Sequence, residues 1–135
     1  MTIVVDVANV MGSRPDGWWR DRAGAAVRLH DQITRLAASD RAALPDDSRP
    51  PESAERPGFV MVLEGAAKAA AARIQPGEVR VVQAGGSGDD AIVAVVRELP
   101  GRRVVVTADR ELRARCVAAG AEILGPGWLL GLLRG

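Results

Sequence analysis

Acidic residues follow four separate apolar segments of this sequence. Asp6 lies within TIVVDV, Glu64 follows FVMVL, Asp89 and Asp90 follow VRVVQ after a glycine-rich turn, and Asp109 follows RVVVT. In an open α/β sheet, ligands bind beyond the carboxyl ends of the parallel strands, which meet at one edge. If these four segments are neighbouring parallel strands, their acids converge on one site.

A cluster of carboxylates favours a cation. Two like charges about 4 Å apart repel by roughly 4 kcal/mol at an effective dielectric near 20, and either proton uptake or cation binding relieves the repulsion. The chain has one cysteine and one histidine, so oxygen ligands and therefore Mg²⁺ or Mn²⁺ are expected. Such an ion polarises a phosphate and activates water. Phosphodiester hydrolysis is the reaction that this chemistry predicts.

Each acid also has a structural interpretation. Asp109 can cap the helix that follows it, Ser87 to Asp90 spells the S-x-x-D of a capping box, and Glu64 can stabilise a helix dipole. Asp6 is hardest to explain in this way, because it interrupts an apolar strand. Helix caps also lie at strand-to-helix junctions, so the shared position of these acids leaves both interpretations open.

The predicted elements alternate between strands and helices. Strands are expected at residues 2–7, 59–63, 79–83, 103–107 and 122–124, and helices at 18–38, 65–74, 89–99, 110–119 and 128–133. This alternation predicts one α/β domain over residues 1–135, with a doubly wound parallel sheet covered on both faces. Residues 42–57 are rich in proline and charge, which predicts a mobile loop.

Composition limits the other possibilities. The apolar runs are shorter than the ~20 residues of a membrane span, and Asp6 interrupts the N-terminal run, so neither a membrane segment nor a signal peptide is predicted. A cytoplasmic location is expected. The formal net charge is +1, so nucleic acid would have to be bound by a local patch rather than by a global field. An oligomer is compatible with these features.

Four motifs together resemble the PIN-like nuclease superfamily, and its NYN branch most closely. They are D-x-x-N at Asp6 and Asn9, the acid Glu64 after the second strand, Gly-Asp-Asp at 88–90 and Thr-Ala-Asp at 107–109. The resemblance implies a three-layer Rossmann-like domain with a sheet of four to five strands in the order 3-2-1-4-5. It also implies a Mg²⁺- or Mn²⁺-dependent ribonuclease acting on single-stranded RNA.

The same resemblance assigns roles to individual residues. Asp6, Asp89 and Asp109 would be metal ligands, Asn9 would orient the site or the substrate, and Glu64 would be a further catalytic acid. Asp90 competes with Asp89, because the doublet leaves the register ambiguous. Many NYN proteins have aspartate where this chain has Glu64, so direct contact of Glu64 with the metal is less secure.

A set of basic and aromatic residues is predicted to contact nucleic acid. Arginines bind phosphates and an exposed tryptophan can stack on a base. For Trp18 a packing role is an equal alternative, and Trp19 is expected in the core because it fits the apolar face of the predicted helix at 18–38. The predicted contacts are Arg14, Trp18, Arg20 and Arg110.

Three alternatives remain open. Gly86, Gly88 and Ala91 form G-x-G-x-x-A before a helix, as in dinucleotide-binding domains. That fingerprint normally follows the first strand, however, and here acids would face the pyrophosphate. A non-catalytic PIN-like module that binds RNA or protein is the second alternative. The segment SRPDGWWRDR also resembles a small bacterial group labelled nucleoside-triphosphate pyrophosphohydrolases, although no motif of such an enzyme supports that activity.

Overall fold

The protein is built on a five-stranded parallel sheet, seen in a computed structural model that describes residues 1–39 and 57–134. Apart from Pro57, the mobile loop predicted at 42–57 lies outside the described residues. The spatial order is β3-β2-β1-β4-β5, which confirms the predicted order 3-2-1-4-5. The strands are β1 (Thr2–Asp6), β2 (Gly58–Leu63), β3 (Val79–Gln83), β4 (Arg103–Val106) and β5 (Glu122–Leu124).

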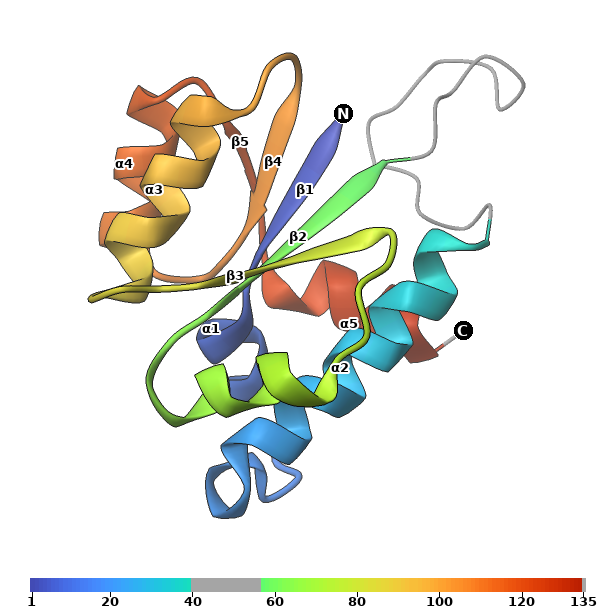
Figure 1. The fold of residues 1–135 in the computed structure, drawn as a ribbon. Coiled ribbons are helices and arrows are strands. Elements are labelled where there is room, and N and C mark those ends of the chain that lie inside the picture. The colour runs from blue at the N-terminus through green and yellow to red at the C-terminus, as the bar shows by residue number, and fades with distance from the viewer. Residues whose placement is uncertain (40–56, 135) are drawn as a thin grey trace.

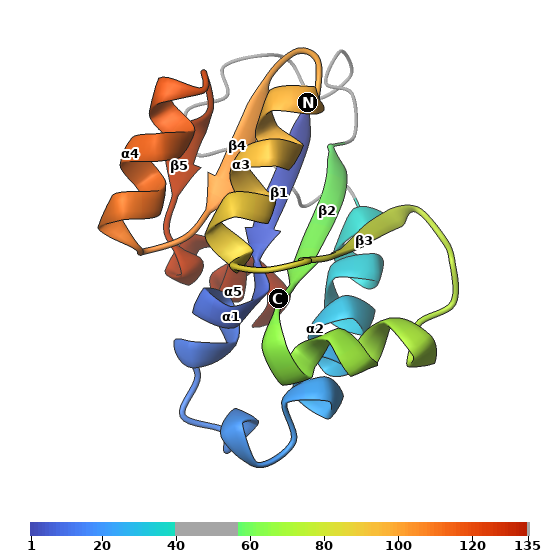
Figure 2. The ribbon, with the colours of Figure 1, turned by 60° about the vertical axis from the view of Figure 1, so that its left-hand side comes forward.

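Helices cover both faces of this sheet and complete three layers (Figures 1 and 2). One face packs against α1 (Val7–Gly12), α2 (Arg22–Ala37), the 3-10 segment η3 (Gly65–Arg73) and α5 (Pro126–Arg134). The other face packs against α3 (Gly88–Glu98) and α4 (Arg110–Ala118). A short 3-10 helix, η1 (Trp18–Arg20), precedes α2.

Alternation along the strands assigns the apolar residues to two cores. In β1, Ile3 and Val5 face the α2 side, whereas Val4 between them faces α3 and α4. Successive side chains of a strand point to opposite faces, and a sheet covered on both faces therefore has continuous apolar strands. This burial on both sides explains why runs such as VVV at 104–106 contain no polar position.

Two predictions about the N-terminal third were wrong. The first strand ends at Asp6, and α1 follows at once where no helix was predicted. The helix predicted over 18–38 is divided, because the Asp21 carboxylate accepts a hydrogen bond from Gly24 N and begins α2 there. Trp19 consequently lies outside α2 and is 55% exposed, so its predicted place in the core is wrong.

The predicted Ala-rich helix at 65–74 is also different in detail. It is wound as the 3-10 segment η3 rather than as an α-helix, although it does bury Ala67 and Ala70. The fifth strand was predicted at its observed position, and the final helix extends two residues earlier than expected, to begin at Pro126. Proline is favoured at the first position of a helix, because its missing N–H would have no helical partner there.

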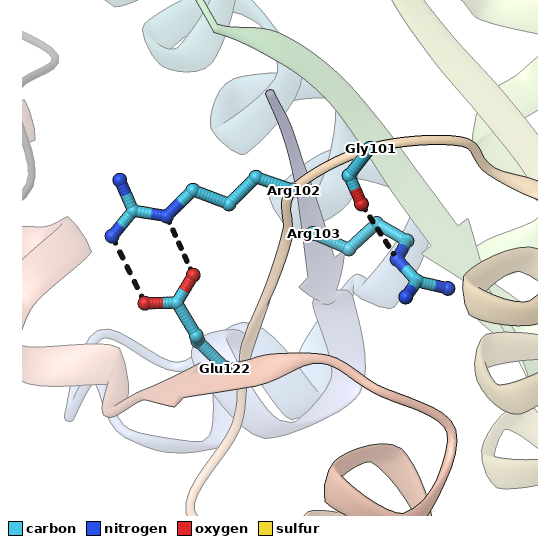
Figure 3. A network of polar contacts seen from close by, with 4 residues as sticks. All are labelled: Gly101, Arg102, Arg103 and Glu122. Atoms are coloured by element: carbon cyan, nitrogen blue, oxygen red, sulfur yellow. Dashed lines mark hydrogen bonds and ion pairs between the residues drawn. The ribbon is translucent and has the colours of Figure 1, made fainter.

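Two arginine side chains, those of Arg102 and Arg103, donate hydrogen bonds at the edge of the sheet where the strands begin (Figure 3). Arg102 donates two hydrogen bonds to the Glu122 carboxylate, at 2.6 and 2.9 Å. Arg103 donates to the carbonyl oxygens of Gly101, at 3.1 Å, and of Val96 at the end of α3, at 2.6 Å. These bonds join β4 to β5 and α3 at the edge opposite the predicted site. No helix within residues 1–39 and 57–134 has the length and apolar character to cross a membrane.

Candidate active site

The two central strands of the sheet end at a topological switch point. β1 and β4 are neighbours, but the chain leaves β1 into α1 on one face and leaves β4 toward α4 on the other. Open α/β sheets bind their ligands in the crevice at such a point. Asp6 is the last residue of β1, and Asp109 follows β4 by three residues, so both stand at this position.

Asp6 is a buried carboxylate, only 7% exposed. Its Oδ1 accepts a hydrogen bond from Asn9 N at 3.3 Å, and its Oδ2 accepts one from Thr107 Oγ1 at 2.9 Å. Burial raises the pKa of Asp6, and the charges of Asp89 and Glu64 raise it further, against the lowering effect of the two hydrogen bonds. Asp6 therefore caps α1 and also lies close to the other acids.

Thr107 and Asn9 tie together the loops that leave the two central strands. Besides donating to Asp6, Thr107 Oγ1 accepts a hydrogen bond from Asp109 N at 3.2 Å. Asn9 Oδ1 accepts one from Ala108 N at 2.8 Å, and Arg113 Nε donates to the Thr107 carbonyl at 2.8 Å. The position of Asp109 relative to Asp6 is thus fixed by direct contacts between the two loops.

Thr107 and Arg113 also belong to the site, although neither was among the predicted site residues. Thr107 is fully buried at the end of an apolar strand, and a buried hydroxyl needs a hydrogen-bond partner. Its position directly after RVVV was the available signal. Arg113 had no comparable signal, because its reach back to Thr107 depends on the first turn of α4.

Glu64 lies at the end of β2 and reaches across to the start of α3. Its Oε2 accepts a hydrogen bond from Gly88 N at 2.8 Å. A Cβ atom at position 88 would lie 2.5 Å from that oxygen, so glycine is required for this close approach. The carboxylate occupies the N-terminus of α3, where its charge is favoured by the helix dipole.

This contact also bears on the G-x-G-x-x-A motif. A dinucleotide-binding domain uses the N–H groups at such a helix start for pyrophosphate, but here Gly88 N already donates to Glu64. The motif also follows β3, the edge strand of the sheet, whereas the fingerprint normally follows the first strand of its unit. Neither feature suits a dinucleotide site.

The side chains of Asp89 and Asp90 have different neighbours: acids for Asp89 and an arginine for Asp90. Burial raises the pKa of Asp89, and the charges of Asp109 and Glu64 raise it further. Asp90 instead pairs with Arg115, at 2.8 Å between Oδ1 and NH2, and its side chain is 72% exposed. Of the two, Asp89 is the one that lies among the acids.

Asp109 caps α4, as its structural interpretation predicted. Its Oδ1 accepts a hydrogen bond from Leu112 N at 2.9 Å, and its charge contributes to the raised pKa of Asp89. The capping role and the nearness to other acids therefore coexist. The S-x-x-D capping box is present only in part, since Ser87 Oγ accepts from Asp90 N while the Asp90 side chain turns to Arg115.

The acids of this edge have the donor chemistry of a Mg²⁺ or Mn²⁺ site, because all are carboxylates. As the side chains stand, no three acidic, histidine or cysteine side chains among the described residues converge closely enough to hold one ion. Both oxygens of Asp6 and one oxygen each of Glu64 and Asp109 are engaged in hydrogen bonds. Shared ligation would require side-chain rotation about fixed backbone positions.

The residues predicted to contact nucleic acid lie in two places. Arg14 NH1 donates to Gln32 Oε1 at 2.9 Å and is half-buried, and Arg20 lies 5.8 Å from the centre of the Trp19 ring. Trp18 is partly buried against the core. Arg110 is exposed in the first turn of α4, directly after Asp109. Arg14, Trp18 and Arg20 thus belong to the segment between α1 and α2, and Arg110 to the acidic edge.

Comparison with known proteins supports the architecture. The sequence matches no protein-family model and no curated protein. The structure is similar to a crystal structure of a variant of Rae1 (YacP) from Bacillus subtilis, with a TM-score of 0.66 and 15% sequence identity. The alignment covers 99% of this chain and 74% of Rae1. At this identity the likeness shows the fold alone. The chain has the Rossmann-like α/β architecture, with the strand order 3-2-1-4-5, that was predicted.

Proposed function

We propose that the protein is a metal-dependent ribonuclease that hydrolyses phosphodiester bonds of single-stranded RNA. The observation that supports the proposal is that acids from four chain segments act on one another. After burial, Asp89 and Glu64 raise the pKa of Asp6, and Asp109 and Glu64 raise that of Asp89. Raised carboxylate pKa values from burial and like charges are typical of functional sites. The PIN-like fold and the motifs at 6–9, 88–90 and 107–109 agree with this activity.

In this proposal Asp6, Asp89 and Asp109 hold Mg²⁺ or Mn²⁺, and Glu64 is a further acid at the site. The bound ion supplies Lewis-acid polarisation of the phosphate and a more acidic water molecule. Thr107 and Asn9 act as positioning residues, because they fix Asp6 and the Asp109 loop relative to each other. Arg110, exposed beside Asp109, is placed to bind a phosphate of the substrate.

The adjacent acids Asp89 and Asp90 allow a closely matched test. Cleavage of a labelled single-stranded RNA should require Mn²⁺ or Mg²⁺ and stop with EDTA. Asp89→Asn should lower the rate at least about 100-fold, which corresponds to about 2.7 kcal/mol of transition-state stabilisation. Asp90→Asn removes the same charge one residue away, but from a side chain paired with Arg115, and should retain most of the activity. Equal rates in all three proteins would contradict the proposal.

A non-catalytic RNA-binding module is the second candidate. It is favoured by the hydrogen bonds that hold Asp6, Glu64 and Asp109 in their present orientations, away from shared ligation of one ion. This candidate predicts RNA binding without Mn²⁺-dependent cleavage, and no effect of Asp89→Asn on affinity beyond the loss of one repelling charge. The cleavage assay and a binding assay on the same RNA distinguish the two.

A further inference from the structure

A pair of tryptophans in η1 has divided roles. Trp18 packs against the hydrophobic core, while Trp19 is 55% exposed. Trp19 and Val117 are the large hydrophobic residues exposed in the part of the chain that the structure describes. Indole is among the largest apolar groups in proteins, and leaving it in water forgoes its favourable burial. An exposed Trp19 therefore suggests a surface that is covered when a ligand binds.

Trp19 is held on a well-defined turn. Gly17 has a φ of 78°, in the left-handed region that glycine adopts readily, and its carbonyl accepts a hydrogen bond from Arg20 N at 3.0 Å. The Asp16 carboxylate accepts one from Trp18 N at 3.2 Å. The rings of Trp18 and Trp19 meet edge to face, 6.1 Å apart and at 89°. The exposed indole of Trp19 is thus oriented by the partly buried indole of Trp18, which limits the conformational entropy lost on binding.

One arginine lies over each of the two rings. The Arg20 guanidinium lies 5.8 Å from the Trp19 ring centre, and that of Arg22 lies 5.4 Å from the Trp18 ring centre. Arg14 lies near two further cations, Arg134 and Arg28. Burial is the largest cause of the lowered pKa of Arg14, the two cations lower it further, and Asp16 raises it. Neighbouring cations repel, so this surface of a nearly neutral chain favours an anionic partner.

The same surface lies close to the acidic edge. A Cβ atom at Gly12, the last residue of α1, would be 3.9 Å from the Trp18 ring. α1 starts directly after Asp6 and has six residues, a length of about 9 Å at 1.5 Å per residue. Figure 2 shows the chain turning beneath α1 before α2 begins. The two sites are therefore separated by one short helix.

We propose that Trp19 is a stacking platform for an unpaired base of single-stranded RNA, with Arg20 and Arg22 on the adjoining phosphates. The naming of RNA rests on the proposed ribonuclease function. Aromatic stacking is sequence-tolerant, because every base presents a π-face, and arginine contacts to phosphate position the strand without reading its sequence. Duplex RNA keeps its bases stacked within the helix and would not use this platform.

The test is a binding measurement that does not depend on cleavage. Affinity for a fluorescently labelled, unstructured single-stranded RNA is measured by anisotropy in EDTA, so that no metal-dependent reaction occurs. Trp19→Ala should weaken binding about tenfold, within the range measured for loss of one stacked base, and Trp19→Phe should retain a large part of it. Val117→Ala, which removes the other exposed apolar side chain, is the matched control and should bind as the wild type does.

Three outcomes would overturn the platform. They are equal affinity of the wild type and Trp19→Ala, an equal loss of affinity for duplex RNA, and no binding of single-stranded RNA by the wild type. Melting temperatures of the variants check that the fold is kept. Loss of binding in Trp19→Ala together with an absence of Mn²⁺-dependent cleavage would support the platform while contradicting the nuclease. Unchanged binding in Trp19→Ala together with metal-dependent cleavage would contradict the platform while supporting the nuclease.

Discussion

Burial is the largest cause of the raised pKa of both Asp6 and Asp89, and neighbouring carboxylates add to it. The two residues differ in what opposes this effect. Asp6 is stabilised as a carboxylate by Thr107 and Asn9, whereas among the described residues only the charge of Arg115 has that effect on Asp89. Of these two acids, Asp89 is therefore the one whose unfavourable burial and repulsion are less compensated.

The direction of the Asp89 shift predicts how stability depends on pH. The folded-state pKa lies above the unfolded value near 3.8, so the folded protein binds the proton more tightly, and stability falls as pH rises from that value through the folded pKa. The penalty is therefore larger at neutral pH than near pH 4. Metal-free Asp89→Asn should thus melt higher than the wild type at pH 7 and lose less stability between about pH 4 and pH 7.

Calorimetry in EDTA across this pH range provides the measurement, with Asp90→Asn as the control. Asp90 is exposed and paired with Arg115, so its substitution should give no increase in melting temperature. An Asp89→Asn protein that melts at or below the wild-type temperature at pH 7 would show that Asp89 carries no such repulsion.

The sequence could not show which residue of the Asp89–Asp90 doublet lies among the other acids. The sequence places both Asp89 and Asp90 after the glycine-rich turn, and their types are identical. Only the packing of α3 against α4, which brings Arg115 to Asp90, distinguishes them. In the same way, the exposure of Trp19 depends on where α2 begins, and that is set by the Asp21 cap rather than by apolar periodicity.

Elements buried on both faces were the easiest to predict. β2 and β4 contain the continuous apolar runs FVMVL and VVV, and both strands were predicted from them. The edge strands β3 and β5 are less buried, but they were also predicted at their observed positions. α1 was missed because its six residues are too few to show a helical period, and Val7 and Val10 favour strands in isolation. It forms because Asp6 caps it and because Val7, Val10 and Met11 are buried.

The hydrogen bond from Gly88 N to Glu64 Oε2 joins the start of α3 to the end of β2. Alanine forms helices better than glycine, so propensity alone predicts that Gly88→Ala stabilises α3. A Cβ there would lie 2.5 Å from Glu64 Oε2 and displace the carboxylate from Gly88 N, so Gly88→Ala should instead lower the melting temperature. In a Glu64→Ala background the contact is absent, and Gly88→Ala should no longer be destabilising.

Gly86→Ala serves as the control for this pair, because nothing lies within 4 Å of a Cβ at that position. Its melting temperature should stay close to that of the wild type. Two results would show that the hydrogen bond from Gly88 N to Glu64 does not help to join the two elements. One is a Gly88→Ala melting temperature as close to the wild-type value as that of Gly86→Ala, and the other is an equal decrease caused by Gly88→Ala with and without Glu64.

The order of the strands in the sheet brings the acids of distant chain segments to one edge. β1 and β4 are neighbours in the sheet, although their first paired residues, Thr2 and Arg103, lie 101 positions apart in the sequence. Alternation of strands and helices predicted a parallel sheet, and the family resemblance supplied its order, which the structure confirms. The hydrogen bonds through Thr107 and Asn9 could not be predicted, because they depend on the relative height of two loops.

We expect the acids at this edge of the sheet to bind a divalent metal. The most direct measurement is an anomalous difference map from a crystal of the protein grown with Mn²⁺. We expect a peak at the switch point contacted by carboxylate oxygens of Asp6, Asp89 and Asp109, with the side chains of Asp6 and Asp109 rotated away from their hydrogen bonds to Asn9 N, Thr107 and Leu112 N. A fully ordered acidic edge with no peak in the presence of Mn²⁺, or a Mn²⁺ ion held by Asp90 and not by Asp89, would contradict it.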